Sequence, residues 1–215
     1  MKPYHKMKLY LAMYLLVKRI IDVVVSFLVF IVLSPLLFLI SILIKIDSPG
    51  SVLFCQKRLG KGGKPFTMYK FRTMHHNAPI IRNPDGSIFV GDGDSRLTRV
   101  GRFLREYTLD EIPQILNVLK GDMSLVGPRP DMVEHLELYD NLKRRKLEVK
   151  PGMANLPLIH GRNSLSWDER AKLDAYYVDH RSLKLDLEIF LKSAVSVLLR
   201  KGVYYPEDPQ DRIRN

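Results

Sequence analysis

The stretch REYTLDEIPQILNVLKGDMSLVGPRP, residues 105–130, decides how this chain folds and where its chemistry lies. Apolar residues recur in it at helical spacing, at Ile112, Ile115, Leu116 and Leu119. The spacing predicts a short helix that ends at Gly121, since glycine is a common helix stop. Two adjacent acids, Asp110 and Glu111, then lie at the start of this helix.

The simplest interpretation of the two acids is that they cap the helix. Thr108 and Glu111 fit a capping box, and Pro113 is tolerated only in or near the first turn. Acidic side chains also stabilise the positive end of the helix macrodipole. Taken alone, the acid pair therefore indicates local structure as readily as catalysis.

The residues around the acids favour a binding site. Gly127, Pro128 and Pro130 predict a stiff, extended turn that holds Arg129 in a fixed place, and Arg105 lies about one turn before the acids. Arginine binds phosphate oxygens through two parallel hydrogen bonds. Guanidinium groups beside a carboxylate pair thus suit an anionic substrate.

Several motifs together resemble a known family. They are LDEIPQ at 109–114, NVLKGDMSLVGPRP at 117–130, KFRTM at 70–74 and GRNSLSW at 161–167. In this order they resemble the bacterial sugar transferases, the monotopic phosphoglycosyl transferases that begin glycan assembly on polyprenol phosphate. The resemblance spans residues 18–202, nearly the whole chain.

The resemblance implies a reaction in two steps. Asp110 would attack the phosphate that bears the sugar in a UDP-sugar, releasing UMP and leaving a phosphosugar on the enzyme. Polyprenol (undecaprenyl) phosphate would then attack this intermediate and give polyprenyl-diphospho-sugar. Glu111 would hold Mg²⁺, which takes few carboxylates and shares its shell with phosphate and water.

The predicted substrate-binding residues are Arg105, Arg129, Lys70, Arg72 and Arg162. Lys70 and Arg72 alternate with aromatic residues, so on a strand the two cations share one face, which could also be an ordinary solvated face. Arg162 belongs to the part of GRNSLSW that matches the family, whereas residues 154–159 depart from the family pattern. This departure weakens any inference about the sugar.

The N-terminal part predicts a membrane element. Residues 23–44 carry no charge and are long enough to cross a bilayer core, but Ser34-Pro35 lies at the centre, where proline bends a helix. Basic residues flank both ends, which places both flanks in the cytoplasm by the positive-inside rule. We expect a re-entrant helical hairpin, as the family resemblance also implies; a kinked spanning helix is the alternative.

The predicted fold class is α+β and mostly helical: the re-entrant membrane hairpin plus a small cytoplasmic catalytic domain with interfacial amphipathic helices. The boundaries are 1–46 for the basic segment and membrane helix, 47–202 for the phosphoglycosyl transferase domain and 203–215 for a C-terminal tail. Ser166 and Glu169 predict a further capping box, and the KRRK run at 143–146 predicts a solvated face.

Charge and cysteine content limit the alternatives. A net charge of +11 indicates an anionic partner, and the only cysteine, Cys55, excludes an internal disulfide and fits a reducing compartment. We expect the cytoplasmic face of a bacterial inner membrane. A membrane-anchored nucleotide-sugar hydrolase would use the same acids and metal. A nucleic-acid-binding module is disfavoured because no binding motif is present. The sequence leaves open which sugar is used and whether the chain forms a homodimer.

Overall fold

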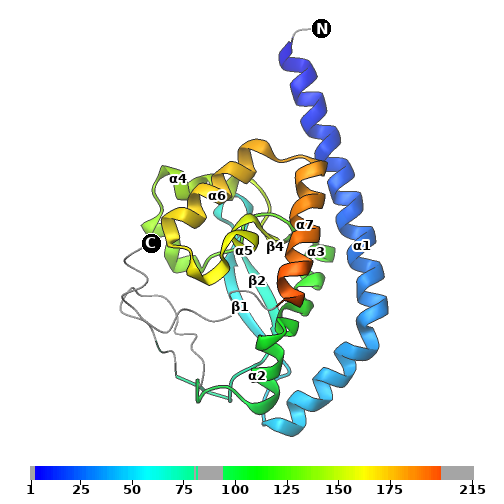
Figure 1. The fold of residues 1–215 in the computed structure, drawn as a ribbon, viewed down its shortest axis with the longest axis vertical. Coiled ribbons are helices and arrows are strands. Elements are labelled where there is room, and N and C mark those ends of the chain that lie inside the picture. The colour runs from blue at the N-terminus through cyan, green and yellow to red at the C-terminus, as the bar shows by residue number, and fades with distance from the viewer. Residues whose placement is uncertain (1–2, 80, 82–93, 200–215) are drawn as a thin grey trace.

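The computed structural model describes residues 3–79, 81 and 94–199 (Figure 1). Its α-helices are α1 (Pro3–Asp47), α2 (Arg99–Glu106), α3 (Ile115–Lys120), α4 (Asn141–Arg144), α5 (Leu156–His160), α6 (Trp167–His180) and α7 (Leu183–Leu198). Its 3₁₀ turns are η1 (Lys61–Gly63), η2 (Leu109–Gln114), η3 (Val133–Leu138), η4 (Arg145–Glu148) and η5 (Arg162–Ser164). The strands are β1 (Leu53–Leu59), β2 (Pro65–Phe71), β3 (Ser124–Val126) and β4 (Gly152–Ala154). The predicted tail, 203–215, lies outside the described residues.

Helix α1 contains the whole predicted membrane segment. It is one continuous helix with Pro35 inside it, and Figure 1 shows that its lighter blue part bends toward α2. It is the one helix of the described chain that is long and apolar enough to cross a membrane, and only 11% of its most apolar window is buried. A single bent helix is therefore observed where the sequence predicted a hairpin.

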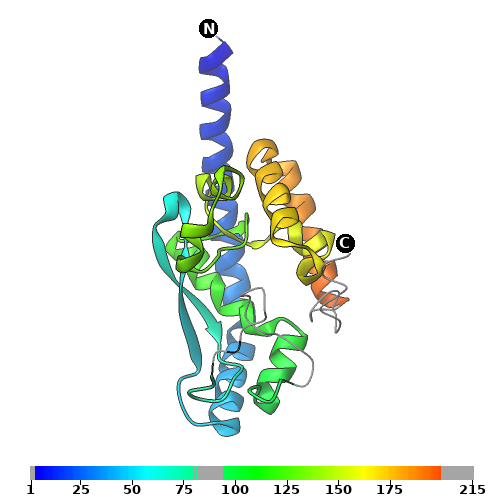
Figure 2. The same ribbon diagram turned by 90° about the vertical axis from the view of Figure 1, so that its left-hand side faces the viewer.

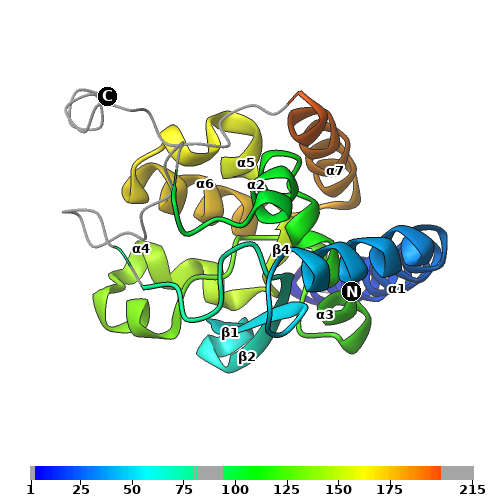
Figure 3. The same ribbon diagram turned by 90° about the horizontal axis from the view of Figure 1, so that it is seen from below.

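The first half of α1 is fastened to the domain by its charged residues. Arg19 donates hydrogen bonds to the carbonyls of Val118 and Leu119, near the end of α3, at 2.7 and 2.9 Å. Lys18 forms an ion pair of 2.8 Å with Asp186 of α7. These two cations, predicted only as flanking charges, thus hold α1 against α3 and α7, which lie beside it in Figure 3.

The far end of α1 is fastened to the same domain. Asp47 accepts a hydrogen bond of 2.9 Å from the backbone nitrogen of Val100 in α2. Ile40 and Ile44 are buried with Phe71 and Leu104 in a small apolar cluster between α1, β2 and α2. Both ends of the apolar segment therefore contact one folded unit, and Figure 2 shows α1 running along it, with only its N-terminal part projecting beyond.

Two small sheets carry the catalytic side of the domain. β1 and β2 form an antiparallel hairpin, and β3 pairs in parallel with β4. Asn117 of α3 ties the hairpin down, because its side chain accepts from the backbone nitrogen of Tyr69 at 3.1 Å and donates to the carbonyl of Thr67 at 2.7 Å. The main hydrophobic core is formed by buried residues of β2, α3, β3, β4, α5, α6 and α7.

The acid-bearing helix differs in part from its prediction. It starts with the tight turn η2, continues as α3 and ends at Gly121 with φ 92°, as predicted. The predicted capping box of Thr108 and Glu111 is wrong, because Thr108 adopts a left-handed conformation (φ 59°) and its side chain caps nothing. The capping box of Ser166 and Glu169 is confirmed at the start of α6.

Candidate active site

A cavity of about 730 Å³ opens between the β1–β2 hairpin, η2 and α6, within the range of small-molecule sites. Asp110 and Glu111 line it from η2, Lys70 from β2 and Arg129 from the turn after β3. The cavity also receives Trp167 and other side chains from the start of α6. Residues that are far apart in the sequence therefore meet around the acid pair.

The carboxylate of Glu111 is bound by two cations. Arg129 donates to both carboxylate oxygens, at 2.6 Å to Oε1 and 3.2 Å to Oε2, and Lys70 donates to Oε1 at 2.8 Å. Burial alone would raise the pKa of Glu111, but Arg129 and Lys70 hold this pKa well below its ordinary value. Glu111 is therefore a fixed anion whose position is set by the two cations.

The contacts of Asp110 differ from those of Glu111, although the two residues are adjacent. It is 8% exposed, and within the described residues it accepts no hydrogen bond and forms no ion pair. Burial raises the pKa of Asp110, and the nearby Lys70 and Arg105 only partly oppose this effect. A carboxylate held close to cations without being bound by them is available to react.

Arg105 and Arg162 lie at the edges of the pair. Arg105 donates from Nε to the hydroxyl of Thr73 at 3.1 Å. Arg162 donates from Nη2 to the hydroxyl of Thr108 at 3.1 Å, while its buried Nη1 has no hydrogen-bond partner. Thr108 thus uses its hydroxyl to position Arg162, which explains why it does not cap the helix.

Arg72 lines the same cavity, but its guanidinium is engaged by the chain just after α1. Its guanidinium donates to the carbonyl of Ser51 at 2.6 Å and to the carbonyl and hydroxyl of Ser48 at 2.9 and 2.7 Å. Arg72 therefore satisfies backbone carbonyls just after α1 and links that helix to β2. Its predicted role in substrate binding stays a prediction.

The turn that carries Arg129 is held by close backbone packing. Gly127 donates to the carbonyl of Ala154 at 3.0 Å, and Gly152 donates to the carbonyl of Pro128 at 2.9 Å. A Cβ atom on Gly152 would lie 2.0 Å from the backbone nitrogen of Gly127, so no other residue fits there without a shift. The predicted stiff turn is confirmed, and its contact with β4 adds a reason that the sequence does not reveal.

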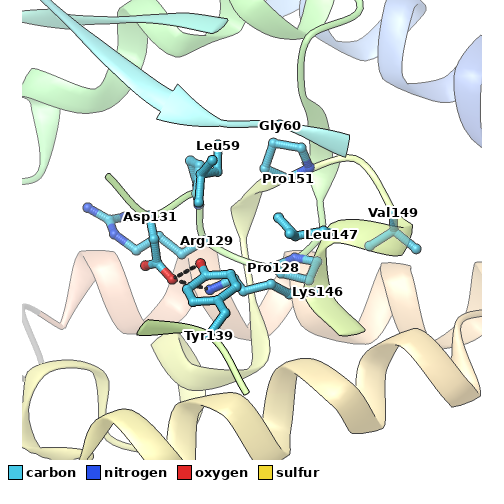
Figure 4. Close-up of a pocket in the computed structure, with 11 residues that line it drawn as sticks. Leu59, Gly60, Pro128, Arg129, Asp131, Tyr139, Lys146, Leu147, Val149 and Pro151 are labelled. Carbon is cyan, nitrogen blue, oxygen red and sulfur yellow. Dashed lines mark hydrogen bonds and ion pairs between the residues drawn. The ribbon is translucent and has the colours of Figure 1, made fainter. Parts of the chain in front are cut away.

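A buried charge cluster supports the same turn (Figure 4). Lys146 lies between Asp131 and Asp174, with ion pairs of 3.0 and 2.9 Å, and the hydroxyl of Tyr139 donates to Asp131 at 2.6 Å. Burial would raise the pKa of Asp131, but Lys146 and Tyr139 keep this pKa below its ordinary value. Lys146 belongs to the KRRK run, so the prediction of a solvated face is wrong for this residue.

Sequence reasoning missed two residues near the acids, Lys146 and Arg58. Arg58 lines the main cavity from the end of β1, and its neighbour Leu59 donates from its backbone to the carbonyl of Asp131 at 2.9 Å. Alternation along FCQKRL could have placed Arg58 and Gln56 on one strand face. The pairing of β1 with the turn at 129–132 is a tertiary contact that no local pattern shows.

The acid pair fits a magnesium ion that is completed by substrate. In the described part of the chain no three His, Cys, Asp or Glu side chains gather as a metal site, so Asp110 and Glu111 would supply at most two protein ligands. Mg²⁺ commonly takes one or two carboxylates and fills its shell with phosphate oxygens and water. Binding at Glu111 requires Lys70 or Arg129 to release one carboxylate oxygen.

Comparison with known proteins agrees with this geometry. The family model described as bacterial sugar transferase matches residues 13–200. An uncharacterized sugar transferase, EpsL, of Bacillus subtilis is 43% identical over 191 residues, which cover 88% of this chain and 91% of that protein. The exopolysaccharide production protein ExoY of Sinorhizobium fredii is 39% identical over 87% of this chain and 88% of its own length.

A third relative carries a substrate in its name. The undecaprenyl-phosphate galactose phosphotransferase of Salmonella typhimurium is 40% identical over 198 residues, which are 87% of this chain but 41% of that protein. The range that the family model matches, residues 13–200, includes both the acid pair and the turn of Arg129. This chain belongs to the bacterial sugar transferase family.

Proposed function

We propose that this protein transfers a sugar-1-phosphate from a UDP-sugar to polyprenol (undecaprenyl) phosphate, releasing UMP, as the initiating step of bacterial glycoconjugate assembly. The observation that carries the proposal is the contrast between the two acids: Asp110 lines the cavity with no hydrogen bond or ion pair to any described residue, whereas Glu111 is held by two cations. The names of relatives such as the Salmonella typhimurium galactose phosphotransferase supply the acceptor and the reaction type.

The first step assigned to Asp110 is attack on the phosphorus that bears the sugar. A carboxylate oxygen forms a bond to phosphorus while the bond to the UMP oxygen breaks and UMP leaves with the electron pair. Repulsion between the carboxylate and the phosphate must be offset, and Arg105, Arg129 and Lys70 lie close enough to do so. The product is a phosphosugar-aspartyl intermediate.

The second step returns Asp110 to its initial state. A phosphate oxygen of the polyprenol phosphate attacks the same phosphorus, and the bond to Asp110 breaks with its electrons on the carboxylate. When bound, Mg²⁺ at Glu111 supplies charge that stabilises the phosphoryl transition state. The metal is testable without turnover: Mn²⁺ in its place should bind with donor present, as seen by electron paramagnetic resonance, and more weakly in Glu111→Gln.

The reaction joins a water-soluble donor to a lipid acceptor, so the site must lie at a membrane surface. We propose that α1 enters and leaves one leaflet on the cytoplasmic face of the inner membrane. Residues 22 to 47 extend roughly 35 to 40 Å as a helix, longer than a bilayer core. Yet Asp22 and Asp47 both bind the same domain, through the backbone nitrogens of Leu125 and Val100. A spanning helix would separate these contacts by the bilayer.

Exposed apolar side chains mark the surface that meets lipid in this proposal. They include Phe27, Leu28, Ile31, Val32 and Phe38 on α1, and Leu187, Leu191, Val195 and Leu198 on α7. Such a surface suits an interfacial helix whose apolar face enters the headgroup region. Cysteines placed near Lys8 and Lys61 should both resist a membrane-impermeant thiol reagent added from the periplasmic side. Labelling at one end alone would instead establish a spanning helix.

The experiment that tests the reaction uses a panel of radiolabelled UDP-sugars, with and without polyprenol phosphate. A transferase releases UMP and makes a lipid-soluble labelled product only when the acceptor is present. A nucleotide-sugar hydrolase would release sugar phosphate equally in both reactions and would make no labelled lipid. The same panel identifies the sugar.

A further inference from the structure

Arg58 is a half-buried cation that forms no ion pair within the described residues. Its Nη2 donates to the side-chain oxygen of Gln56 at 2.6 Å, its buried Nε has no hydrogen-bond partner, and within the described residues no carboxylate lies at ion-pair distance from it. Arg129 and Lys70, in contrast, both form ion pairs with Glu111. Arg58 lines the cavity with no such ion pair among the described residues, and Asp131, Glu111 and Glu134 act on it only from a longer distance.

Such an arrangement is unfavourable for folding. Moving a guanidinium out of water costs free energy that an ion pair normally offsets, and a neutral amide offsets only part of it. Burial and the nearby Arg129 lower the pKa of Arg58 to about 10, so the group still carries its charge at neutral pH. Because no ion pair among the described residues offsets the free energy of desolvating Arg58, we expect a bound anion to offset it.

The position of Arg58 defines what this ligand is. β1 ends beside the turn of Arg129, since Leu59 binds the backbone of Asp131 and Arg58 bridges to Met132. Glu111 and Arg129 both act electrostatically on Arg58, which places it next to the reacting pair. Arg162 also lines the cavity and is half-buried; within the described residues it forms no ion pair, and its buried Nη1 has no hydrogen-bond partner.

We infer that Arg58 is a substrate-binding residue that holds a phosphate group in the cavity, which Arg162 also lines. The inference rests on the proposed function for the identity of the phosphate, which belongs either to the nucleotide-sugar donor or to the lipid phosphate acceptor. Arg129 and Lys70 share Glu111, whereas Arg58 and Arg162 form no ion pair within the described residues, so their charge adds to the attraction for a phosphate.

Two substitutions test this assignment in different ways. Arg58→Met removes the charge. Gln56→Glu keeps Arg58 and its packing but gives it a carboxylate partner, because the amide oxygen already accepts from Arg58 at 2.6 Å. Lys57→Met is the matched control: it removes one charge from the adjacent residue, which is exposed on the opposite face of the same strand. All three are made in the full chain.

Binding is measured with inorganic pyrophosphate and with the UDP-sugar in an Asp110→Asn background, and the acceptor KM is measured in the active protein. Arg58→Met and Gln56→Glu should each weaken pyrophosphate binding about 10- to 100-fold, the usual effect of a charge-assisted hydrogen bond. Their midpoints of thermal unfolding should stay equal to the wild type or rise, since a charge without an ion pair is removed or paired. Lys57→Met should change neither quantity.

The outcomes separate this inference from the proposed function. A weakened donor assigns Arg58 to the nucleotide-sugar phosphates, and an increase confined to the acceptor KM assigns it to the lipid phosphate. Unchanged pyrophosphate, donor and acceptor values in both variants would overturn the inference, as would a fall in the unfolding midpoint with binding intact. If the wild type makes no labelled lipid, the proposed function fails, while pyrophosphate binding still decides the role of Arg58.

Discussion

Two clusters of charged side chains meet at the turn that carries Arg129, and their charges are paired in different ways. In one, Lys146 lies between Asp131 and Asp174, and Tyr139 donates to Asp131 (Figure 4). In the other, Arg129 and Lys70 bind Glu111, but within the described residues Asp110 and Arg58 form no ion pair. Both clusters line the same cavity, so they differ in pairing and not in exposure to it.

The comparison teaches how to separate structure from function among buried charges. A buried group whose partners satisfy it needs no ligand to explain it, whereas an unsatisfied group at a cavity wall has a cost that only a ligand offsets. Asp110 and Glu111 are adjacent in the sequence and face the same cavity. Their contacts nevertheless predict opposite roles.

The largest effect is expected when either of the two acids, Asp110 or Glu111, is replaced. Asp110→Asn should abolish the covalent intermediate and lower turnover at least about 10³-fold, because an amide has no anionic oxygen with which to attack. Glu111→Gln should slow both steps about 10²-fold but still form the intermediate. The measurement is intact mass after incubation with labelled UDP-sugar and no acceptor. An adduct on Asp110→Asn would reverse the assignment.

A smaller effect concerns the geometry of Arg129. Arg129→Lys should lower turnover about 10²-fold although the charge is kept, because lysine cannot bind both oxygens of Glu111 at once. Arg144→Lys, on the exposed side of α4, is the matched control and should behave as wild type. Equal rates for Arg129→Lys and wild type would show that this residue acts through charge alone.

The cluster of Lys146, Asp131 and Asp174 should affect stability more than chemistry. Lys146→Met leaves two buried carboxylates without a cation and should lower the free energy of unfolding by about 3–5 kcal/mol in denaturant titrations. Adding Asp131→Asn and Asp174→Asn should restore much of this loss, because no unpaired charge is then buried. Arg145→Met removes only half-exposed ion pairs with Glu148 and Asp179 and should cost less than about 1 kcal/mol. Equal losses for Lys146→Met and Arg145→Met would contradict the contrast.

The sequence predicted the parts of the site that local patterns encode. The acid pair, the stiff turn of Arg129 and the long apolar helix all follow from spacing, glycine and proline positions, and runs of apolar residues. The failures share one cause. Thr108 fits a capping box, but its hydroxyl accepts a hydrogen bond from Arg162. Lys146 lies in a basic run, but it is buried between two aspartates. Each depends on a partner far away in the sequence.

The final prediction concerns the pH dependence of the two acids. Burial raises the pKa of Asp110, whereas Arg129 and Lys70 hold the pKa of Glu111 well below its ordinary value. Between the ordinary aspartate pKa and the raised value, the folded protein therefore binds a proton at Asp110 that the unfolded chain does not. Formation of the intermediate should fall about tenfold per pH unit as the pH drops below the raised pKa. Glu111 stays charged throughout this window, so it does not contribute to the fall.

The two acids should also affect the pH dependence of folding stability in opposite directions. Because the folded protein binds the extra proton at Asp110, its stability should rise as the pH falls through this window, and Asp110→Asn should remove that rise. The contribution of Glu111 to stability is present above its unfolded pKa and is lost only at lower pH, as the pH falls through its depressed folded pKa.

Lys70 is the charge that most opposes the effect of burial on Asp110, so Lys70→Met should move the midpoint of the single-turnover pH profile upward. Lys120→Met, on α3 outside the cavity, should leave the midpoint in place. A midpoint that does not move in Lys70→Met would show that the titrating group is not Asp110, and the distinction drawn between the two acids would then have to be abandoned.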